Sequence, residues 1–290
     1  MRFELTGDQV DFRHALDDLL AASNTVAAAR AWSEGDHALG LGIWKRLADA
    51  GVNGLLVEDG SAVDLVVAHE ALGHHLAVGP WLEVAALSAT HPGRVAAGEL
   101  LTVAAPGAGF ALDADVAELV EGEVGARLES VDTTRRLFAT AGRCTGDADV
   151  AALACAAQLL GAGERVVADT VTYVQQRQQF GRAIGSFQAV KHRLADVRIA
   201  LDFARPLIYG AALSVSTGSA TGSRDVSAAK AFTADAAWQA ARAGLQLHGA
   251  VGYTQELDLG LWILRIRALV SAWGTPTEHR ARVLQRLVAR

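Results

Sequence analysis

Two glycine-bearing segments in the second half of the sequence carry residue types that could hold a phosphate-bearing ligand. They contain Arg177, Phe180, Gly181, Phe187 and Gln188 in the first segment, and Gln246, Gly249 and Gly252 in the second. A guanidinium can hold a pyrophosphate through paired, charge-assisted hydrogen bonds. Glutamine offers a nucleotide edge both a donor and an acceptor, and glycine lets the backbone approach a ligand where a Cβ would collide.

Each of these residue types also has an ordinary structural explanation. An arginine that follows a long helix can be a solvated cation that interacts with the negative end of the helix dipole. Gly249 and Gly252 can be the glycines that end a helix. From the residue types alone, these structural explanations are favoured over contact with a ligand.

The elements that must position these segments are mostly helices. Thr6 and Gln9 have the spacing of a capping box before an amphipathic helix, and helical patterns also cover 44–50, 64–76 and 80–88. Short apolar runs separated by Pro, Gly and Asp follow at about 99–146 and predict a few short strands. The helical period then returns, which predicts helices at about 149–177, 186–216, 224–248, 256–272 and 276–288, with Ser186 and Thr275 as N-caps.

This pattern predicts a mainly α protein. We expect an N-terminal helical domain at 1–95, a truncated middle β segment at 96–148 and a C-terminal bundle of long helices at 149–290.

Composition and charge restrict the class of protein. The 290 residues are 51% hydrophobic and 20% charged, which favours packed helices. The net charge of −6 argues against nucleic acid as the main partner. Cys144 and Cys155 indicate ordinary thiols in a reduced chain, and His74 and His75 lack a third ligand nearby, so no metal site is predicted. With no signal segment and no uninterrupted run of about 18 apolar residues, we expect a cytoplasmic protein that does not span a membrane.

The two glycine-bearing segments resemble the flavin-binding signatures of the acyl-CoA dehydrogenase family. Arg-x-x-Phe-Gly, which begins at Arg177, is followed at close spacing by Phe-Gln and by Leu-Ala-Asp, which ends at Asp196. Weaker similarity at 5–9, 44–57, 70–80 and 131–137 extends the resemblance over most of the chain. The resemblance implies the family's plan of helices, middle β domain and helical bundle, and it assigns the residues of both segments to FAD contact in a neighbouring subunit's site. Ala250 stands where the family usually has a second glycine.

The same comparison finds no carboxylate at either place where the family keeps its catalytic base. That base removes the α-proton of the acyl thioester while the flavin takes hydride from the β-carbon, so its position is strict. One place, before the final helix, is Trp273, whose indole cannot accept a proton. The other, counted back along the helix that ends at Arg177, is about Ala151. Asp149 and Glu256 are the alternatives for a relocated base, although Asp149 lies on another helix face and Glu256 suits a first-turn helix acid.

The middle segment departs from the family as well. The stretch from Pro92 to Ala148 is too short for the two-layer sheet with which family members cover the flavin and the acyl chain. We therefore expect a subunit of a heteromeric acyl-CoA dehydrogenase, similar to the shorter subunits of heterotetrameric actinobacterial enzymes of steroid catabolism.

In that arrangement a full-length homologue supplies the base and binds most of the acyl-CoA. FAD is shared between the two chains, an electron-transfer flavoprotein or similar acceptor takes the electrons, and the isolated chain is inactive. The alternatives are a flavin-free helical scaffold and a self-sufficient homo-oligomeric flavoenzyme with an unusual base.

Overall fold

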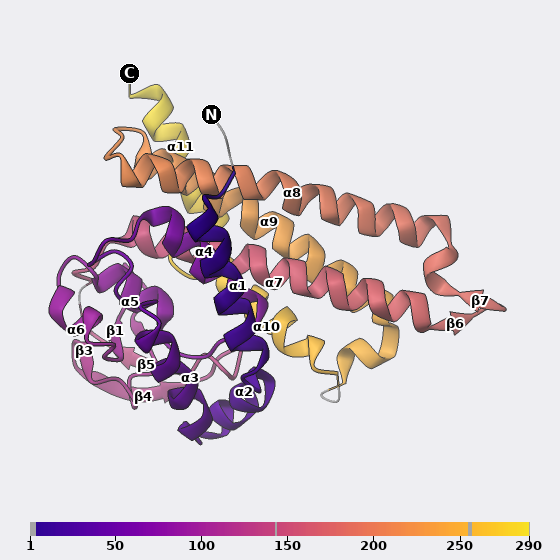
Figure 1. Ribbon diagram of the computed structural model, residues 1–290, viewed down its shortest axis with the longest axis horizontal. Coiled ribbons are helices and arrows are strands. Elements are labelled where there is room, and N and C mark those ends of the chain that lie inside the picture. Colours follow the sequence, from indigo (N-terminus) through magenta and orange to yellow (C-terminus); the bar gives the residue numbers. More distant parts are fainter. Residues whose placement is uncertain (1–3, 143, 255–256, 290) are drawn as a thin grey trace.

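The computed structural model describes residues 4–142, 144–254 and 257–289 (Figure 1). Its long helices lie side by side, and the shorter helices and strands gather at one end of them. The C-terminal bundle consists of α7 (Ala148–Gln176), α8 (Gln188–Ser216), α9 (Gly222–His248), α10 (Leu259–Ser271) and α11 (Pro276–Val288). These bounds agree closely with those predicted from the helical period, and the mainly α class is confirmed.

The N-caps of the bundle were predicted with mixed success. Thr275 forms a capping box with Glu278 at the start of α11, as expected. The prediction for Ser186 was wrong, because Ser186 ends a short 3-10 turn (η1, Ile184–Ser186) and its hydroxyl donates to the carbonyl of Ala183 at 2.7 Å. Phe187 therefore occupies the N-cap of α8, without a side-chain hydrogen bond.

The N-terminal part of the chain is helical. Thr6 and Gln9 form the predicted capping box at α1. The helices are α1 (Gly7–Ala21), α2 (Thr25–Glu34), α3 (Ala38–Asp49), α4 (Ala62–His74), α5 (Trp81–Leu87) and α6 (Pro92–Ala96). The period did not predict α2, although Asn24 caps its start and Gly35, with a φ of 92°, ends it.

The middle of the chain contains the short strands that the apolar runs predicted. They are β1 (Leu101–Val103), β2 (Phe110–Leu112), β3 (Leu119–Glu121), β4 (Val124–Leu128) and β5 (Leu137–Thr140). β1 pairs with β3 in parallel, and β2, β5 and β4 form an antiparallel sheet in that order. Every residue of β4 is exposed, so one edge of this sheet is uncovered.

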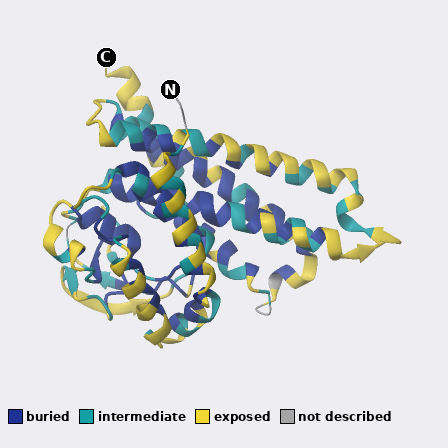
Figure 2. Cartoon of the chain, viewed as in Figure 1, coloured by how far each residue is buried: buried dark blue, intermediate teal, exposed yellow. Residues whose placement is uncertain are grey.

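The core is centred on α7, which packs against α4 and α5 with its first half and against α8 and α9 of the bundle (Figure 2). All residues of α7 from 150 to 163 are buried. A Cβ on Gly73 of α4 would lie 2.1 Å from the carbonyl oxygen of Gln158, and a Cβ on Gly161 of α7 would lie 2.0 Å from that of Glu70. Only glycine permits this close approach of the two helices.

By length and composition, α7 and α8 are both apolar enough to cross a membrane. The apolar window of α7 is 83% buried, which is what the core helix of a folded domain shows, whereas that of α8 is 33% buried. The uncovered face of α8 carries Ile199, Phe203 and Leu207, which are exposed. The division of the chain into three domains stays a prediction.

Candidate functional site

The first glycine-bearing segment forms a hairpin at the end of α7. Arg177 is the C-cap of α7, and the strands β6 (Gln178–Gln179) and β7 (Arg182–Ala183) follow it in antiparallel register. Phe180 and Gly181 form the turn between the strands, with φ values of 54° and 77°. A two-residue turn with positive φ at both central positions matches the right-handed twist of the strands in a tight hairpin. The hairpin projects from the bundle (Figure 1), and the Phe180 side chain is 89% exposed at its tip.

Aromatic and cationic side chains lie together on this hairpin. The Arg182 guanidinium lies 4.0 Å from the centre of the Phe187 ring, a cation–π contact. The Phe180 ring meets the Phe187 ring edge to face, with centroids 6.1 Å apart. Gln188 is exposed in the first turn of α8, where its amide lies 3.4 Å from His192. The segment thus presents a surface of aromatic rings and polar groups.

The second segment forms the end of α9 and the 3-10 turn η2 (Gly249–Tyr253). Gly249 ends α9 with a φ of 61°, and a Cβ there would meet open space. Gly252 is buried, and a Cβ there would lie 3.0 Å from the carbonyl oxygen of Leu245. Gly252 therefore packs against its own helix, whereas Gly249 and Gln246 face outward.

The ends of α7 and α9 are joined by Tyr173 and His248. Their rings stack with centroids 4.2 Å apart, and the Tyr173 hydroxyl donates to the His248 carbonyl at 3.5 Å. The structure thereby brings both segments to the same end of the bundle (Figure 1). Among the described residues, the side chains of Arg177 and Gln246 form no hydrogen bond or ion pair with the protein. Neither side chain is therefore engaged in a polar contact within the part of the chain that the structure describes.

Trp273 lies in the turn between α10 and α11, far from the hairpin. It adopts a φ of 54°, and its indole N–H donates to Oε1 of Glu83 at 3.3 Å. His279 contacts its carbonyl at 3.1 Å, and the buried ammonium of Lys230 donates to the carbonyls of Leu269, Val270 and Gly274. The turn is thus held from several sides.

Ala151, near the other place that the resemblance gives for the family's base, and Asp149, one of the two alternative carboxylates, have different surroundings. Ala151 is completely buried in α7. Asp149 accepts a hydrogen bond from Arg282 at 2.5 Å and is engaged in this ion pair. Glu256 lies outside the described residues. His75 contacts Asp17 at 3.1 Å, and no group of three metal-binding side chains occurs within the described part of the chain.

A cavity of about 280 Å³ lies beside Trp273, and the sequence did not predict it. Glu83 of α5 and Arg135 are the buried charged residues of its lining. Burial raises the pKa of the Glu83 carboxyl, and the nearby Arg135 guanidinium opposes this change. A single acid in the apolar run Trp-Leu-Glu-Val-Ala-Ala-Leu was the signal that could have identified Glu83.

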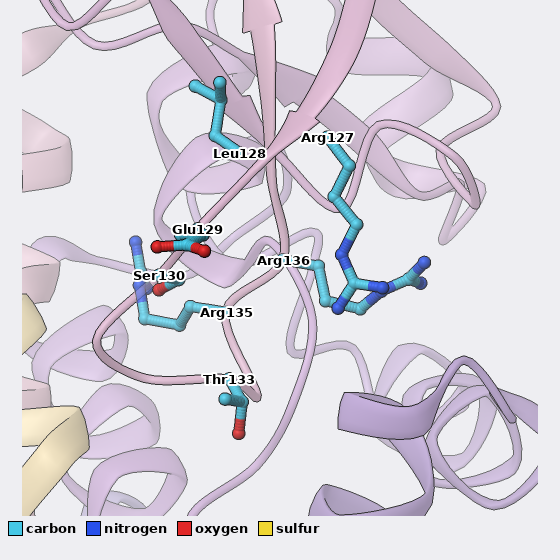
Figure 3. A pocket seen from close by; sticks show the side chains of 7 residues that line it. All are labelled: Arg127, Leu128, Glu129, Ser130, Thr133, Arg135 and Arg136. Carbon is cyan, nitrogen blue, oxygen red and sulfur yellow. The ribbon is translucent and has the colours of Figure 1, made fainter.

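Arg135 also lines a second, arginine-rich pocket of about 470 Å³ under β4. Figure 3 shows the guanidinium groups of Arg127 and Arg136 close together, while the Arg135 side chain lies apart from them, beside Ser130. Arg136 is paired with Asp115. Arg135 is the residue that the two pockets share.

Comparison with known proteins identifies the family. Residues 144–288 match the model of the family described as "Acyl-CoA dehydrogenase, C-terminal domain". The acyl-CoA dehydrogenase IpdE2 of Mycobacterium tuberculosis (strain ATCC 25618 / H37Rv) is 31% identical over 95% of this chain and 94% of its own length.

Solved structures agree with the sequence match. A chain of the ChsE4-ChsE5 complex from Mycobacterium tuberculosis superimposes with a TM-score of 0.84 at 25% identity, over 100% of both chains. A chain of the steroid ACAD Tcur3481-Tcur3483 gives the same TM-score at 22% identity, over 97% of this chain and 98% of its own. By sequence and by fold, the chain belongs to the acyl-CoA dehydrogenase family.

Proposed function

We propose that the chain is a subunit of a heteromeric, FAD-dependent acyl-CoA dehydrogenase that lacks the catalytic glutamate and contributes FAD-binding residues to its partner's site. One observation carries the proposal. The exposed side chains of Arg177 and Gln246 form no hydrogen bond or ion pair with any described residue at one end of the bundle, and the resemblance to the family puts Trp273 and about Ala151 at the two places of its base.

The exposed end of the bundle fits the dinucleotide half of FAD. Arg177 would hold the pyrophosphate, Gln246 would pair with a nucleotide edge, and the open space beside Gly249 would let the cofactor reach the backbone. The hairpin and the start of α8 would complete the contact through Phe180, Gly181, Phe187 and Gln188. Gly252 would shape the turn η2 of the second segment. When bound, FAD supplies the acceptor for the hydride of the acyl β-carbon. This chain's residues bind and orient it.

The partner in this proposal is a full-length homologue that supplies the base, covers the flavin and binds most of the acyl-CoA. The short sheet of β2, β5 and β4, in which the edge strand β4 is exposed, supports these separate roles of the two subunits, because so small a sheet can cover little of a flavin ring. ChsE4-ChsE5 is a complex, and Tcur3481-Tcur3483 is a steroid ACAD. By analogy, we propose a heterotetramer in the cytoplasm that oxidises a bulky acyl group such as a steroid-CoA and passes electrons to an electron-transfer flavoprotein or similar acceptor.

Co-expression with a full-length homologue from the same genome tests the proposal. We expect the complex to be yellow and to dehydrogenate an acyl-CoA, and the isolated chain to be colourless and inactive. Arg177→Ala should lower the flavin content of the complex without dissociating it. The matched control is Arg280→Ala on α11, away from the hairpin, which should leave the flavin content unchanged.

Other outcomes would favour the alternatives. Activity of the purified chain alone would support a self-sufficient enzyme with an unusual base, and the ion pair of Asp149 with Arg282 argues against that residue in the role. A colourless complex with every homologue tried would support a flavin-free scaffold.

A further inference from the structure

Arg135 is a buried cation that lines the cavity beside Trp273. Its side chain is 9% exposed, and its guanidinium lies 3.9 Å from Oε1 of Glu83, beyond hydrogen-bond distance. Within the described residues, this guanidinium donates no hydrogen bond. The Arg135 guanidinium, a planar group with five N–H donors, therefore lines the cavity beside Trp273 and can donate to the acceptor of a ligand.

Glu83 is its incomplete partner. Oε1 accepts one hydrogen bond, from the Trp273 indole, while Oε2 is buried without a partner in the described part of the chain. A buried polar atom left unpaired destabilises the fold, by roughly 1–3 kcal/mol. The terminal torsion of a glutamate is soft, so a modest rotation can turn either oxygen toward the cavity. Among the described residues, Oε2 of Glu83 thus has no donor and the guanidinium of Arg135 has no acceptor.

The remaining walls of the cavity are mainly apolar. Val103 and Leu112 are buried in their strands, Phe110 and Trp273 add rings, and the exposed carboxylate of Glu278 lies among the lining residues. At about 280 Å³, the cavity is near the lower end of the roughly 300–1,000 Å³ that ligand pockets span. It suits a small apolar body with one polar head.

We propose that this cavity binds a small, largely apolar molecule that ends in a primary carboxamide or an un-ionised carboxylic acid. Such a head presents an acceptor and a donor on the same side, so that its carbonyl can accept from Arg135 while its N–H or O–H donates to Glu83. An ester lacks the donor, and a trans secondary amide directs its C=O and N–H in opposite directions. The two carboxylates, Glu83 and Glu278, disfavour an ionised acid. The site lies within one subunit and does not depend on the proposed function.

Benzamide is a suitable probe for the full-length chain. Its binding can be followed by the ¹H–¹⁵N signal of the Trp273 indole, which is assigned by its loss in Trp273→Phe. We expect a saturable shift with a Kd of about 1 mM, which is reasonable for so small a ligand. N-methylbenzamide and methyl benzoate have the same ring without the required head, and should bind about tenfold more weakly or not at all.

Variants test whether the binding occurs in this cavity. Glu83→Gln and Arg135→Lys should each weaken benzamide binding by about tenfold. Arg127→Lys, in the adjacent arginine-rich pocket but outside this cavity, should leave binding unchanged. The absence of a saturable shift in the wild-type protein would overturn the proposal. Equal binding of all three compounds, or binding insensitive to both variants, would overturn it too. Should Glu83→Gln fail to fold, the compound series and Arg135→Lys still decide.

Discussion

The Arg265 guanidinium of α10 donates through Nε to Oδ2 of Asp132 over 2.6 Å, and both side chains are almost completely buried. Its other nitrogens donate to Thr134 Oγ1 at 2.7 Å and to the Ala77 carbonyl at 3.1 Å. Asp132 Oδ1 accepts from the backbone and hydroxyl of Thr134. One arginine of the bundle thus connects the turn before β5 with the segment between α4 and α5.

Removing one partner of this pair should be strongly destabilising. Asp132→Ala leaves a guanidinium buried without its counter-charge, so we expect the free energy of unfolding to fall by about 3–5 kcal/mol. Urea denaturation followed by circular dichroism measures the change. In the matched control, Asp235→Ala removes the partner of Arg280 in an exposed pair and should change stability by less than about 1 kcal/mol. Equal effects at the two positions would contradict the role assigned to Arg265.

Alanine should have opposite effects at two helical glycines. In Gly73→Ala the new Cβ lies 2.1 Å from the Gln158 carbonyl oxygen, so α4 and α7 must move apart. We expect a loss of about 1–3 kcal/mol or more, since a packed backbone cannot easily yield. A Cβ on Gly42, in α3, meets no atom within 4 Å, and Gly42→Ala should gain about 0.5–1 kcal/mol from helix propensity. Thermal unfolding of both variants gives the sign, and stabilisation by Gly73→Ala would exclude the close helix contact.

Local signals predicted most of the long helices but missed α2, and they could not predict contacts between residues far apart in the sequence. The period and the turn residues define α7 to α11, and the cap spacing at Thr6 and Thr275 marks two helix starts. The start of α8 was misplaced because the side chain of Ser186 bonds to the preceding turn. The cavity depends on the hydrogen bond between Glu83 and Trp273. A hydrophobic period cannot predict a contact between residues so far apart in the sequence.

The candidate site shows the same limit. The two glycine-bearing segments were singled out by their resemblance to the family's signatures, but the stacking of Tyr173 on His248, which brings the two helix ends together, follows only from the packing of α7 on α9. The contribution of the segments to a partner's site stays a prediction.

Asp113 should make stability depend on pH. Burial raises the pKa of its carboxyl from 3.8 to about 7, while the indole of Trp32 and the guanidinium groups of Arg135 and Arg136 oppose the rise and Glu83 adds to it. The folded carboxyl therefore keeps its proton at a pH where the unfolded one has lost it. The resulting stability is present below about pH 4 and is lost as the pH rises toward 7, by at most about 1.4 kcal/mol per pH unit.

Asp113→Asn removes this titration and retains an acceptor for the Trp32 indole N–H, which Asp113 Oδ1 binds at 2.9 Å. Asparagine also tolerates the left-handed backbone at this position, where φ is 50°. Denaturant titrations at several pH values measure the free energy of unfolding of both proteins. From about pH 4 to 7 this free energy should rise in the variant relative to the wild type, and outside that range the difference between the two should stay constant. A difference that does not change with pH would show that Asp113 ionises normally in the fold.

Tyr173 should control how well the two glycine-bearing segments are held together. Tyr173→Leu removes the ring that stacks on His248, which costs about 0.5–1.5 kcal/mol. Tyr173→Phe keeps the ring and loses only a long hydrogen bond of 3.5 Å. We therefore expect faster amide hydrogen exchange at 249–254 in the leucine variant and little change in the phenylalanine variant. In the co-expressed complex, the flavin content should fall in the leucine variant and persist in the phenylalanine variant. The reason is that Arg177 and Gln246 can bind the same cofactor molecule only if the ends of α7 and α9 are held together. If exchange accelerates and the flavin content does not fall, the segments bind separately or bind something other than FAD.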